Sequence, residues 1–154
     1  MQASIHQIIY HSTATRAIGE EELGRLVSQA RIHNYSHAVT GILFYAGEQF
    51  LQVLEGEPAI VAQLYEHISY DSRHTNLTTM RYAPVAQRLF PNWSMEFSHV
   101  QSTALARLTS YFEPEQQAAL LPDTIDTQEM LTDLLLKFVA EATAAPPSWL
   151  HKDL

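Results

Sequence analysis

The sequence predicts an α+β sandwich, in which two helices cover one face of an antiparallel-rich sheet. Two observations support this prediction. Apolar residues recur with a period of two in some segments of roughly the first hundred residues and with a period of about 3.6 in others. Glycine and proline separate several of these segments, as expected where a strand or a helix begins or ends. The 154 residues, of which 46% are hydrophobic, suffice for one domain with a sizeable core and an extension.

The first half of this sandwich consists of three predicted strands and one helix. Residues 4–10 are rich in isoleucine and predict the first strand. A helix is predicted over residues 20–34, since apolar residues recur on one helical face at Leu23, Leu26, Val27 and Ala30. Residues 39–46 and 49–54 predict two more strands, and the short turn between them lets the two strands pair as a hairpin.

The second half adds a helix and two strands. Pro58 favours the first turn of a helix, along one side of which lie Ile60, Leu64, His67 and Ile68. Strands are predicted over residues 78–85 and 94–100. The resulting order, βαββαββ, is that of a ferredoxin-like sandwich with both helices on one face of the sheet. We assign this domain to residues 1–101.

Residues 102–154 predict a helical extension. Their composition shifts to alanine, leucine and glutamine. A wide apolar stripe predicts a last helix and contains Met130, Leu131, Leu134, Leu135, Phe138 and Ala142. Such a stripe is expected to bury against the free face of the sheet or against another subunit, so we expect the protein to form a homo-oligomer.

The composition excludes several classes of function. The chain has 9 basic and 17 acidic residues and a net charge of −8, which argues against direct binding of nucleic acid. There is no cysteine, so disulfides, thiolate metal sites and thiol nucleophiles are excluded. No apolar run approaches the length of a membrane span, and the N-terminus lacks the pattern of a signal peptide. The expected location is therefore the cytoplasm.

The stretch F-L-Q-V-L-E-G, residues 50–56, places a carboxamide in an otherwise apolar strand. Because side chains alternate along a strand, Gln52 shares its face with Phe50 and Leu54, while Leu51 and Val53 point to the other face. An unpartnered buried amide costs roughly 1–3 kcal/mol. A neighbouring side chain or a ligand is therefore expected to bind the head group of Gln52.

Further polar residues fall where core residues are expected. Two of them continue the apolar stripe of the first helix, two lie near the C-terminal end of the second helix, and one cation follows that helix, where it suits a phosphate. The first strand contributes a tyrosine. Each residue singly has a structural explanation, such as a helix cap, but a planar ligand between the two helices and over the sheet would satisfy all of them. These residues are Tyr10, His33, Asn34, His67, Asp71 and Arg73.

Five short motifs carry a resemblance to a known family. They are I-I-Y-H-S around Tyr10, Asn34 before V-T-G-I-L, the segment F-L-Q-V-L-E-G-E, D-S-R-H at 71–74, and F-P-N-W-S-M at 90–95. In order and spacing these motifs resemble the BLUF family of blue-light sensors, which use flavin adenine dinucleotide (FAD). The resemblance covers about residues 4–100, and the remaining third resembles, by layout only, the helical extension of short stand-alone members.

The resemblance implies a role for each matched residue. Tyr10 would donate an electron and a proton to the excited flavin, and Gln52 would be the switch between the Tyr10 hydroxyl and the ring. A carboxamide suits this role because one head group carries both a donor and an acceptor. The other implied residues are Asn34 at the polar edge of the ring, Arg73 and Asp71 at the ribose-phosphate end, and Trp93 with Met95 as a signalling pair on one face of the fifth strand. Two candidate residues depart from the commonest family pattern: His33 stands at a position of asparagine in other members, and His67 at a position where a longer basic residue is frequent.

Three alternatives to a photoreceptor remain open at this stage. A metal site is one, but only His33 and His37 have the spacing that places two ligands on one helix face. An acyl-phosphate hydrolase is another; Arg16 would serve it, but the loop lacks a glycine-rich phosphate cradle. A cofactor-free regulatory module is the third. We favour a sensor without catalytic turnover, whose output is a changed contact with a protein partner.

Overall fold

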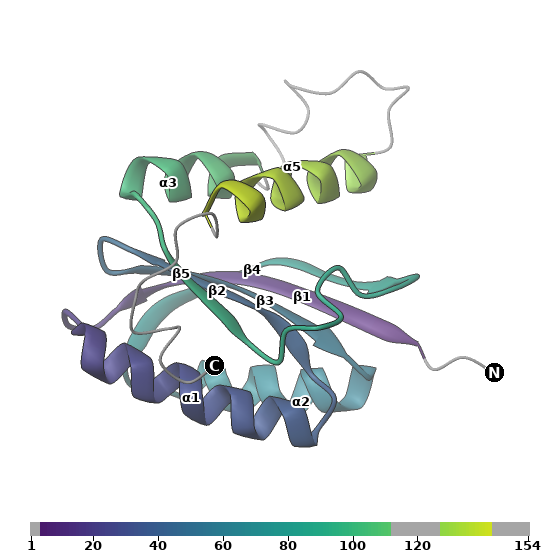
Figure 1. Ribbon diagram of the computed structural model, residues 1–154, viewed down its shortest axis with the longest axis horizontal. Helices are drawn as coiled ribbons and strands as arrows, with labels where there is room; N and C mark the ends of the chain where they lie inside the picture. The colour runs from purple at the N-terminus through teal and green to yellow at the C-terminus, as the bar shows by residue number, and fades with distance from the viewer. Residues whose placement is uncertain (1–3, 112–126, 143–154) are drawn as a thin grey trace.

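The computed structural model describes residues 4–111 and 127–142, which form one five-stranded sheet with helices on both faces (Figure 1). The strand order is β4-β1-β3-β2-β5. Along the chain the elements are β1 (Ile5–Ala14), α1 (Glu20–Ser36), β2 (Thr40–Ala46), β3 (Gln49–Gly56), α2 (Pro58–Ser69), β4 (His74–Val85), β5 (Glu96–His99), α3 (Ser102–Tyr111) and α5 (Thr127–Ala142).

The sheet confirms the predicted ferredoxin-like sandwich. β1 pairs antiparallel with both β3 and β4, and β2 pairs antiparallel with β3 as the predicted hairpin. Gly47 and Glu48 form the hairpin turn with φ of 53° and 69°, the left-handed region that tight hairpin turns require. The fifth strand, β5, lies parallel to β2 at the edge of the sheet, so the sheet is mixed rather than purely antiparallel.

Several strand boundaries differ from the prediction, and β1 ends at Ala14 rather than at residue 10. β4 begins at His74 rather than at residue 78, because β1 continues to Ala14 and pairs with β4 along this whole length, with two irregularities in register. β5 covers only Glu96–His99 instead of residues 94–100. The backbone before Glu96 therefore runs outside the regular sheet.

Helices α1 and α2 cover one face of the sheet, as predicted (Figure 1). Leu23 and Val27 of α1 are buried in one cluster with Phe50 of β3. Val61 of α2 is buried in a second cluster with Leu54 of β3. Each fully buried aliphatic side chain of this kind contributes about 1.5–3 kcal/mol. This face carries Gln52, so the predicted alternation along β3 is confirmed.

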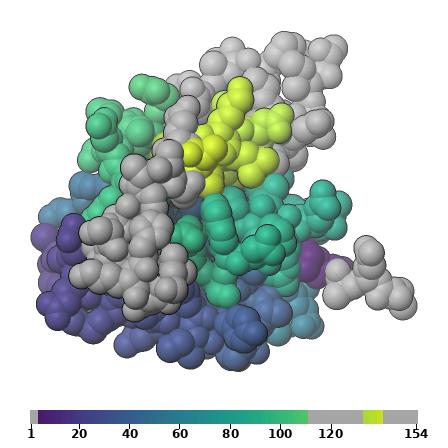
Figure 2. Space-filling view, in the orientation of Figure 1, coloured from purple at the N-terminus to yellow at the C-terminus, as the bar shows by residue number. Residues whose placement is uncertain are grey.

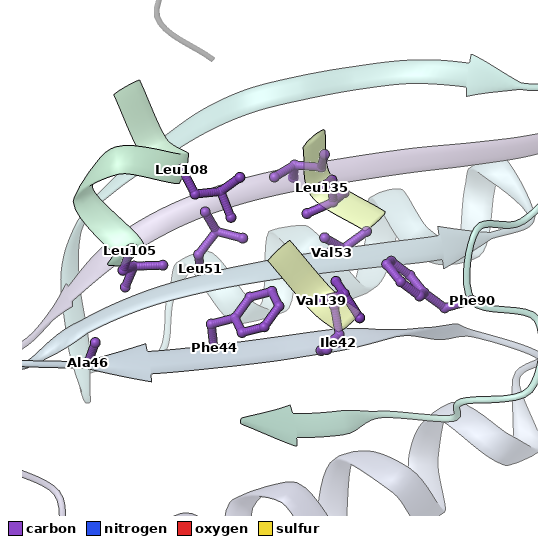
Figure 3. Close-up of a cluster of buried hydrophobic side chains, with 11 residues drawn as sticks. Ile42, Phe44, Ala46, Leu51, Val53, Phe90, Leu105, Leu108, Leu135 and Val139 are labelled. Carbon is purple, nitrogen blue, oxygen red and sulfur yellow. The ribbon is translucent and has the colours of Figure 1, made fainter. Parts of the chain in front are cut away.

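Helices α3 and α5 cover the opposite face of the sheet, as the close-up in Figure 3 shows. In the space-filling view of Figure 2 they lie on the upper side of the molecule, and α1 lies on the lower side. The predicted stripe on the last helix thus buries, in part, against the free face of the sheet. The side chains of Met130, Leu131 and Ala142 are not among those that the structure describes. The described cluster contains Ile42, Phe44, Leu51, Val53, Leu105, Leu108, Leu135 and Val139.

None of the helices within the described ranges is both long enough and apolar enough to span a bilayer.

Candidate functional site

Tyr10, Gln52 and Met95 form a chain of buried polar contacts between β1, β3 and the segment before β5. Tyr10 and Gln52 are directly opposite each other in the β1–β3 pair. The Tyr10 hydroxyl donates a hydrogen bond to Gln52 Oε1, and Gln52 Nε2 donates to Met95 Sδ at 3.4 Å. Gln52 is only 7% exposed, and both the oxygen and the nitrogen of its amide have a partner. A buried amide with both ends bonded avoids the cost of an unsatisfied polar group.

The surroundings of Tyr10 keep its hydroxyl neutral. Burial raises the pKa of Tyr10 above its ordinary value, and the nearby Tyr65 and Asp71 raise it further. The Tyr65 ring lies beside the Tyr10 ring, with 5.4 Å between the ring centroids. A neutral phenol carries the proton that it donates to Gln52, so this arrangement preserves the hydrogen bond across the usual pH range.

Asn34 is buried on the inward side of the last turn of α1, as predicted. Its Nδ2 donates to the carbonyl oxygen of Ser94 at 2.9 Å. One helical turn earlier, Arg31 Nε donates to the carbonyl oxygen of Met95 at 2.7 Å. The backbone N–H of Gly41, where β2 begins, donates to the carbonyl oxygen of Trp93 at 2.9 Å. Three successive carbonyls before β5 are therefore held by α1 and β2.

The two predicted histidines do not lie in the core. His33 and His67 are both exposed, so their placement on inward-facing stripes was wrong. Val27 and Asn34 are seven residues apart and share a face, whereas His33 is rotated from that face by about 100°. His33 still lies beside the site, with Nδ1 at 3.4 Å from Asn34 Oδ1. Its ring stacks on His37 with 4.2 Å between centroids.

Asp71 and Arg73 form an ion pair in the turn between α2 and β4. Arg73 Nε lies 2.9 Å from Asp71 Oδ1, and its backbone N–H donates to the same oxygen at 2.9 Å. The hydrogen bonds from Arg73 lower the pKa of Asp71 to about 2. The carboxylate thus fixes the position of the guanidinium, which remains partly exposed at this end of α2.

Trp93 and Met95 lie on opposite faces of the sheet, so the prediction of a shared face was wrong. Met95 packs in the cluster under α2, and Trp93 packs against the cluster under α3 and α5. The alternation on which the prediction relied holds only within a regular strand, and β5 begins after both residues, at Glu96. The segment that carries them therefore connects the two faces.

The residues around Gln52 suit a planar ring. Leu43, which pairs with Gln52 across β2 and β3, is only partly buried, although it lies on the sheet face that both helices cover. Ala30 of α1 and Leu64 and Ile68 of α2 are also partly buried against the same cluster. Apolar side chains from two helices and the sheet thus surround the polar Tyr10–Gln52 pair. This set of residues fits the isoalloxazine ring of FAD, which has apolar faces and a polar edge.

The sequence reasoning missed Arg31, and it included His74 only as the last residue of the D-S-R-H motif. Arg31 precedes Asn34 by one helical turn, and this spacing on one helix face was the available signal. His74 lies between Ser12 Oγ and the carbonyl oxygen of Ile68, with both distances at 2.7 Å. Since a carbonyl oxygen only accepts, His74 Nε2 carries a proton. Across the described ranges no group of three or more metal-binding side chains is present.

A family model matches the part of the chain that contains most of the sheet and helices α1 and α2. The family model "Sensors of blue-light using FAD", BLUF, matches residues 5–96. This region is a sensor domain rather than an enzyme domain, and the match favours the sensor over the acyl-phosphate hydrolase and over the cofactor-free module.

Individual relatives and solved structures agree with this match. The chain is 29% identical over 140 residues to the photoactivated adenylate cyclase subunit beta of Euglena gracilis, covering 90% of this chain and 14% of that protein. It is 35% identical over 91 residues to the blue light- and temperature-regulated antirepressor BluF of Escherichia coli (strain K12), covering 58% of this chain and 22% of that protein. The chain thus spans less than a quarter of either curated relative.

Two solved structures are similar to this fold over nearly their whole length. BlrB, a BLUF protein in its dark state, has a TM-score of 0.65 and 25% identity, with 92% of this chain and 98% of that chain covered. BlsA in its photo-activated state has a TM-score of 0.63 and 25% identity, with 94% and 98% covered. The chain belongs to the BLUF family, the sensors of blue light using FAD.

Proposed function

We propose that Tyr10 is the photochemical donor of this sensor and that Gln52 is its switch. FAD, when bound, absorbs the blue light and accepts one electron. Loss of an electron makes a phenol strongly acidic, so the Tyr10 proton would pass along its hydrogen bond to Gln52 Oε1. Once Tyr10 has lost its proton, its oxygen can no longer donate to Gln52 Oε1, so the head group of Gln52 would form a different set of hydrogen bonds. Return of one electron and one proton to Tyr10 would then restore the neutral phenol and leave Gln52 with no added proton. The observation that supports this proposal is the buried Tyr10–Gln52–Met95 chain.

The proposed FAD site uses both ends of the space between α1 and α2. Asn34 Oδ1, at the end of α1, lies 3.4 Å from His33 Nδ1 and has a second lone pair that can accept from the polar edge of the ring. Arg73, oriented by Asp71, supplies positive charge for the ribose-phosphate end. His67 is exposed on α2 and adds to that charge only when it is protonated.

The proposed signal passes from one face of the sheet to the other. Gln52 contacts Met95, whose segment leads back to Trp93 and its cluster with Phe138 of α5. We assign the sensor to residues 1–101 and the output to residues 102–154, working in the cytoplasm, which suits a chain without cysteine. The output is a changed contact with a protein partner, and nucleic acid is not bound directly.

The proposed homo-oligomer uses α5. Leu136 is 40% exposed on this helix although its neighbour Leu135 is fully buried, so α5 has apolar surface on a second side. The experiment is Leu136→Asp, which is expected to lower the mass in solution measured by light scattering. An unchanged mass would exclude α5 as the contact.

Photochemistry by Tyr10 is tested by substitution at two buried tyrosines. Tyr10→Phe removes the donor hydroxyl and is expected to abolish the reversible red shift of the flavin bands under blue light. Tyr45→Phe is the matched control, since Tyr45 is also buried on this face of the sheet but belongs to another cluster. Both spectra are recorded at equal flavin content. A normal shift in Tyr10→Phe would exclude Tyr10 as the donor.

A further inference from the structure

Glu55 is a fully buried carboxylate whose two oxygens bind the segment between β4 and β5. It has 0% exposed surface and lies in β3, three residues after Gln52. Because side chains alternate along a strand, it points to the opposite face from Gln52. Its Oε2 accepts from Gln7 Nε2 at 3.0 Å and from the backbone N–H of Leu89 at 2.8 Å, and its Oε1 accepts from the backbone N–H of Phe90 at 2.8 Å.

The backbone of Glu55 strengthens the same attachment. Its carbonyl oxygen accepts from Arg88 Nη1 at 3.0 Å, and the same nitrogen donates to Thr40 Oγ1 at 2.9 Å. Three consecutive residues, 88–90, are therefore bound to one residue of β3. A charge buried this completely is tolerated only where hydrogen bonds compensate for lost hydration. The two backbone donors and Gln7 supply them.

This attachment fixes one end of the segment that joins the two faces of the sheet. At the other end, the carbonyls of Trp93, Ser94 and Met95 are held by α1 and β2. Between the two ends, the Phe90 and Trp93 rings stack with 5.5 Å between centroids and 6° between planes. Phe90 is one of the labelled residues in the cluster beneath α5 (Figure 3). The segment thus has a fixed end at Phe90 and reaches the Gln52 switch at Met95.

We propose that Glu55 is a positioning residue for signal transmission: it holds residues 88–90 as a fixed point, so that movement at Met95 is passed to Trp93 and the cluster under α5. This proposal rests on the proposed function of Gln52. Without the fixed point, a change at Met95 would be absorbed by displacement of the backbone near Phe90. Glu55 itself contacts neither the switch nor the proposed flavin site.

The test separates the flavin response from the response of Trp93. In a Trp149→Phe background Trp93 is the single tryptophan, so its fluorescence reports the connecting segment. Glu55→Gln replaces one acceptor oxygen by an NH2 group, which cannot accept from a backbone N–H. The matched control is Glu57→Gln, which makes the same change of charge at an exposed residue two positions later.

The expected result is a normal red shift of the flavin in both variants at equal flavin content. The light-induced change in Trp93 fluorescence should fall at least about twofold in Glu55→Gln and stay at the parental amplitude in Glu57→Gln. A parental Trp93 response in Glu55→Gln would overturn the proposal. A parent protein without any red shift would instead contradict the proposed function, so the two failures are distinguishable.

Two further measurements cover the case in which Glu55→Gln does not fold. The double variant Gln7→Glu with Glu55→Gln keeps one carboxylate and one amide in the same buried space but moves the carboxylate to β1; it should lose the Trp93 response and keep the red shift. In the unaltered protein, hydrogen exchange at the amides of Leu89 and Phe90 should be slow in the dark and equally slow in the light. A retained Trp93 response in the double variant, or light-induced loss of protection at both amides, would overturn the proposal.

Discussion

At the scale of single residues, the central feature is an amide that uses its donor and its acceptor at once. Gln52 accepts from Tyr10 and donates to Met95, although its nearest neighbours along β3, residues 50, 51, 53 and 54, are all apolar. A leucine would offer neither bond, and a carboxylate would offer no donor. A head group with both a donor and an acceptor is what the proposed exchange between two hydrogen-bond patterns, with Tyr10 and a bound flavin, requires.

The raised pKa of Tyr10 predicts a specific loss of stability at alkaline pH. Above pH 10 the unfolded chain ionises Tyr10 while the folded protein keeps it protonated, so the folded state binds more protons and the free energy of unfolding falls as pH rises. One retained proton corresponds to about 1.4 kcal/mol per pH unit. Urea titrations of FAD-loaded protein should therefore show a shallower decline above pH 10 in Tyr10→Phe than in the parent.

Below about pH 9 Tyr10 is protonated in the folded and in the unfolded chain. The free energies of unfolding of the parent and of Tyr10→Phe should therefore depend on pH in the same way there. Equal slopes above pH 10 would show that Tyr10 ionises normally in the folded protein. Tyr35→Phe is the control, because Tyr35 is 82% exposed and should not change the slope.

Residue periodicity predicted part of this site and failed at identifiable positions. Tyr10, Asn34 and Gln52 are buried, as their periods indicate. His33 and His67 are exposed and each lies one position away from a residue of the inward-facing stripe. Periodicity places the boundary of such a stripe with an uncertainty of about one residue. Glu55 was not singled out, because its partners are backbone N–H groups of a distant segment, which leave no pattern in the sequence.

At the scale of elements, the site depends on the close approach of β2 to β3. A Cβ atom added to Gly41 would lie 1.8 Å from the carbonyl oxygen of Val53, so only glycine allows this pairing. The N–H of Gly41 also holds the carbonyl of Trp93. One residue thus sets both the hairpin and one attachment of the segment before β5.

Gly41→Ala is therefore expected to destabilise the protein strongly. The added methyl group meets backbone rather than a movable side chain, and overpacking of this kind costs about 1–3 kcal/mol or more. Gly19→Ala is the control, since a Cβ there has no atom within 4 Å. Urea midpoints of the two variants provide the comparison, and equal midpoints would show that β2 and β3 can separate at little cost.

The order of the helices and strands was predictable because each amphipathic segment has its own hydrophobic period. The path of the segment between β4 and β5 was not predictable. The sequence indicated βαββαββ and the hairpin, and the structure confirms both. The region between β4 and β5 has no regular period. Its path across the sheet edge is set by contacts with Glu55, Asn34 and Arg31, which are distant in sequence.

At the scale of the whole molecule, the sheet separates the proposed sensing side, under α1 and α2, from the proposed output side, under α3 and α5. Tyr10 and Gln52 lie on the face that α1 and α2 cover. Leu51 and Val53 of the same β3 strand lie under α3 and α5 (Figure 3). A packed core transmits displacement poorly by deformation and better by exchange between discrete arrangements. Residues 93–95 connect the proposed switch contact at Met95 to Trp93, which packs against the cluster under α3 and α5.

Attachment of α5 to the sheet predicts a large difference between two adjacent leucines. Leu135→Ala leaves a cavity in a fully buried position and should lower the free energy of unfolding by about 2–5 kcal/mol. Leu136→Ala, at 40% exposure, should change it by less than about 0.5 kcal/mol. Both are measured by urea unfolding at one low protein concentration. Equal effects would mean that α5 does not pack on the sheet in solution.

The most direct test of the central claim is the dark-minus-light absorption spectrum of Gln52→Leu. Leucine is similar in volume to glutamine and keeps the strand packed, so FAD should remain bound. The parent should show a reversible red shift of the flavin bands under blue light, and Gln52→Leu at equal flavin content should show none. A normal reversible red shift in Gln52→Leu would show that Gln52 is only a structural amide and would contradict the switch.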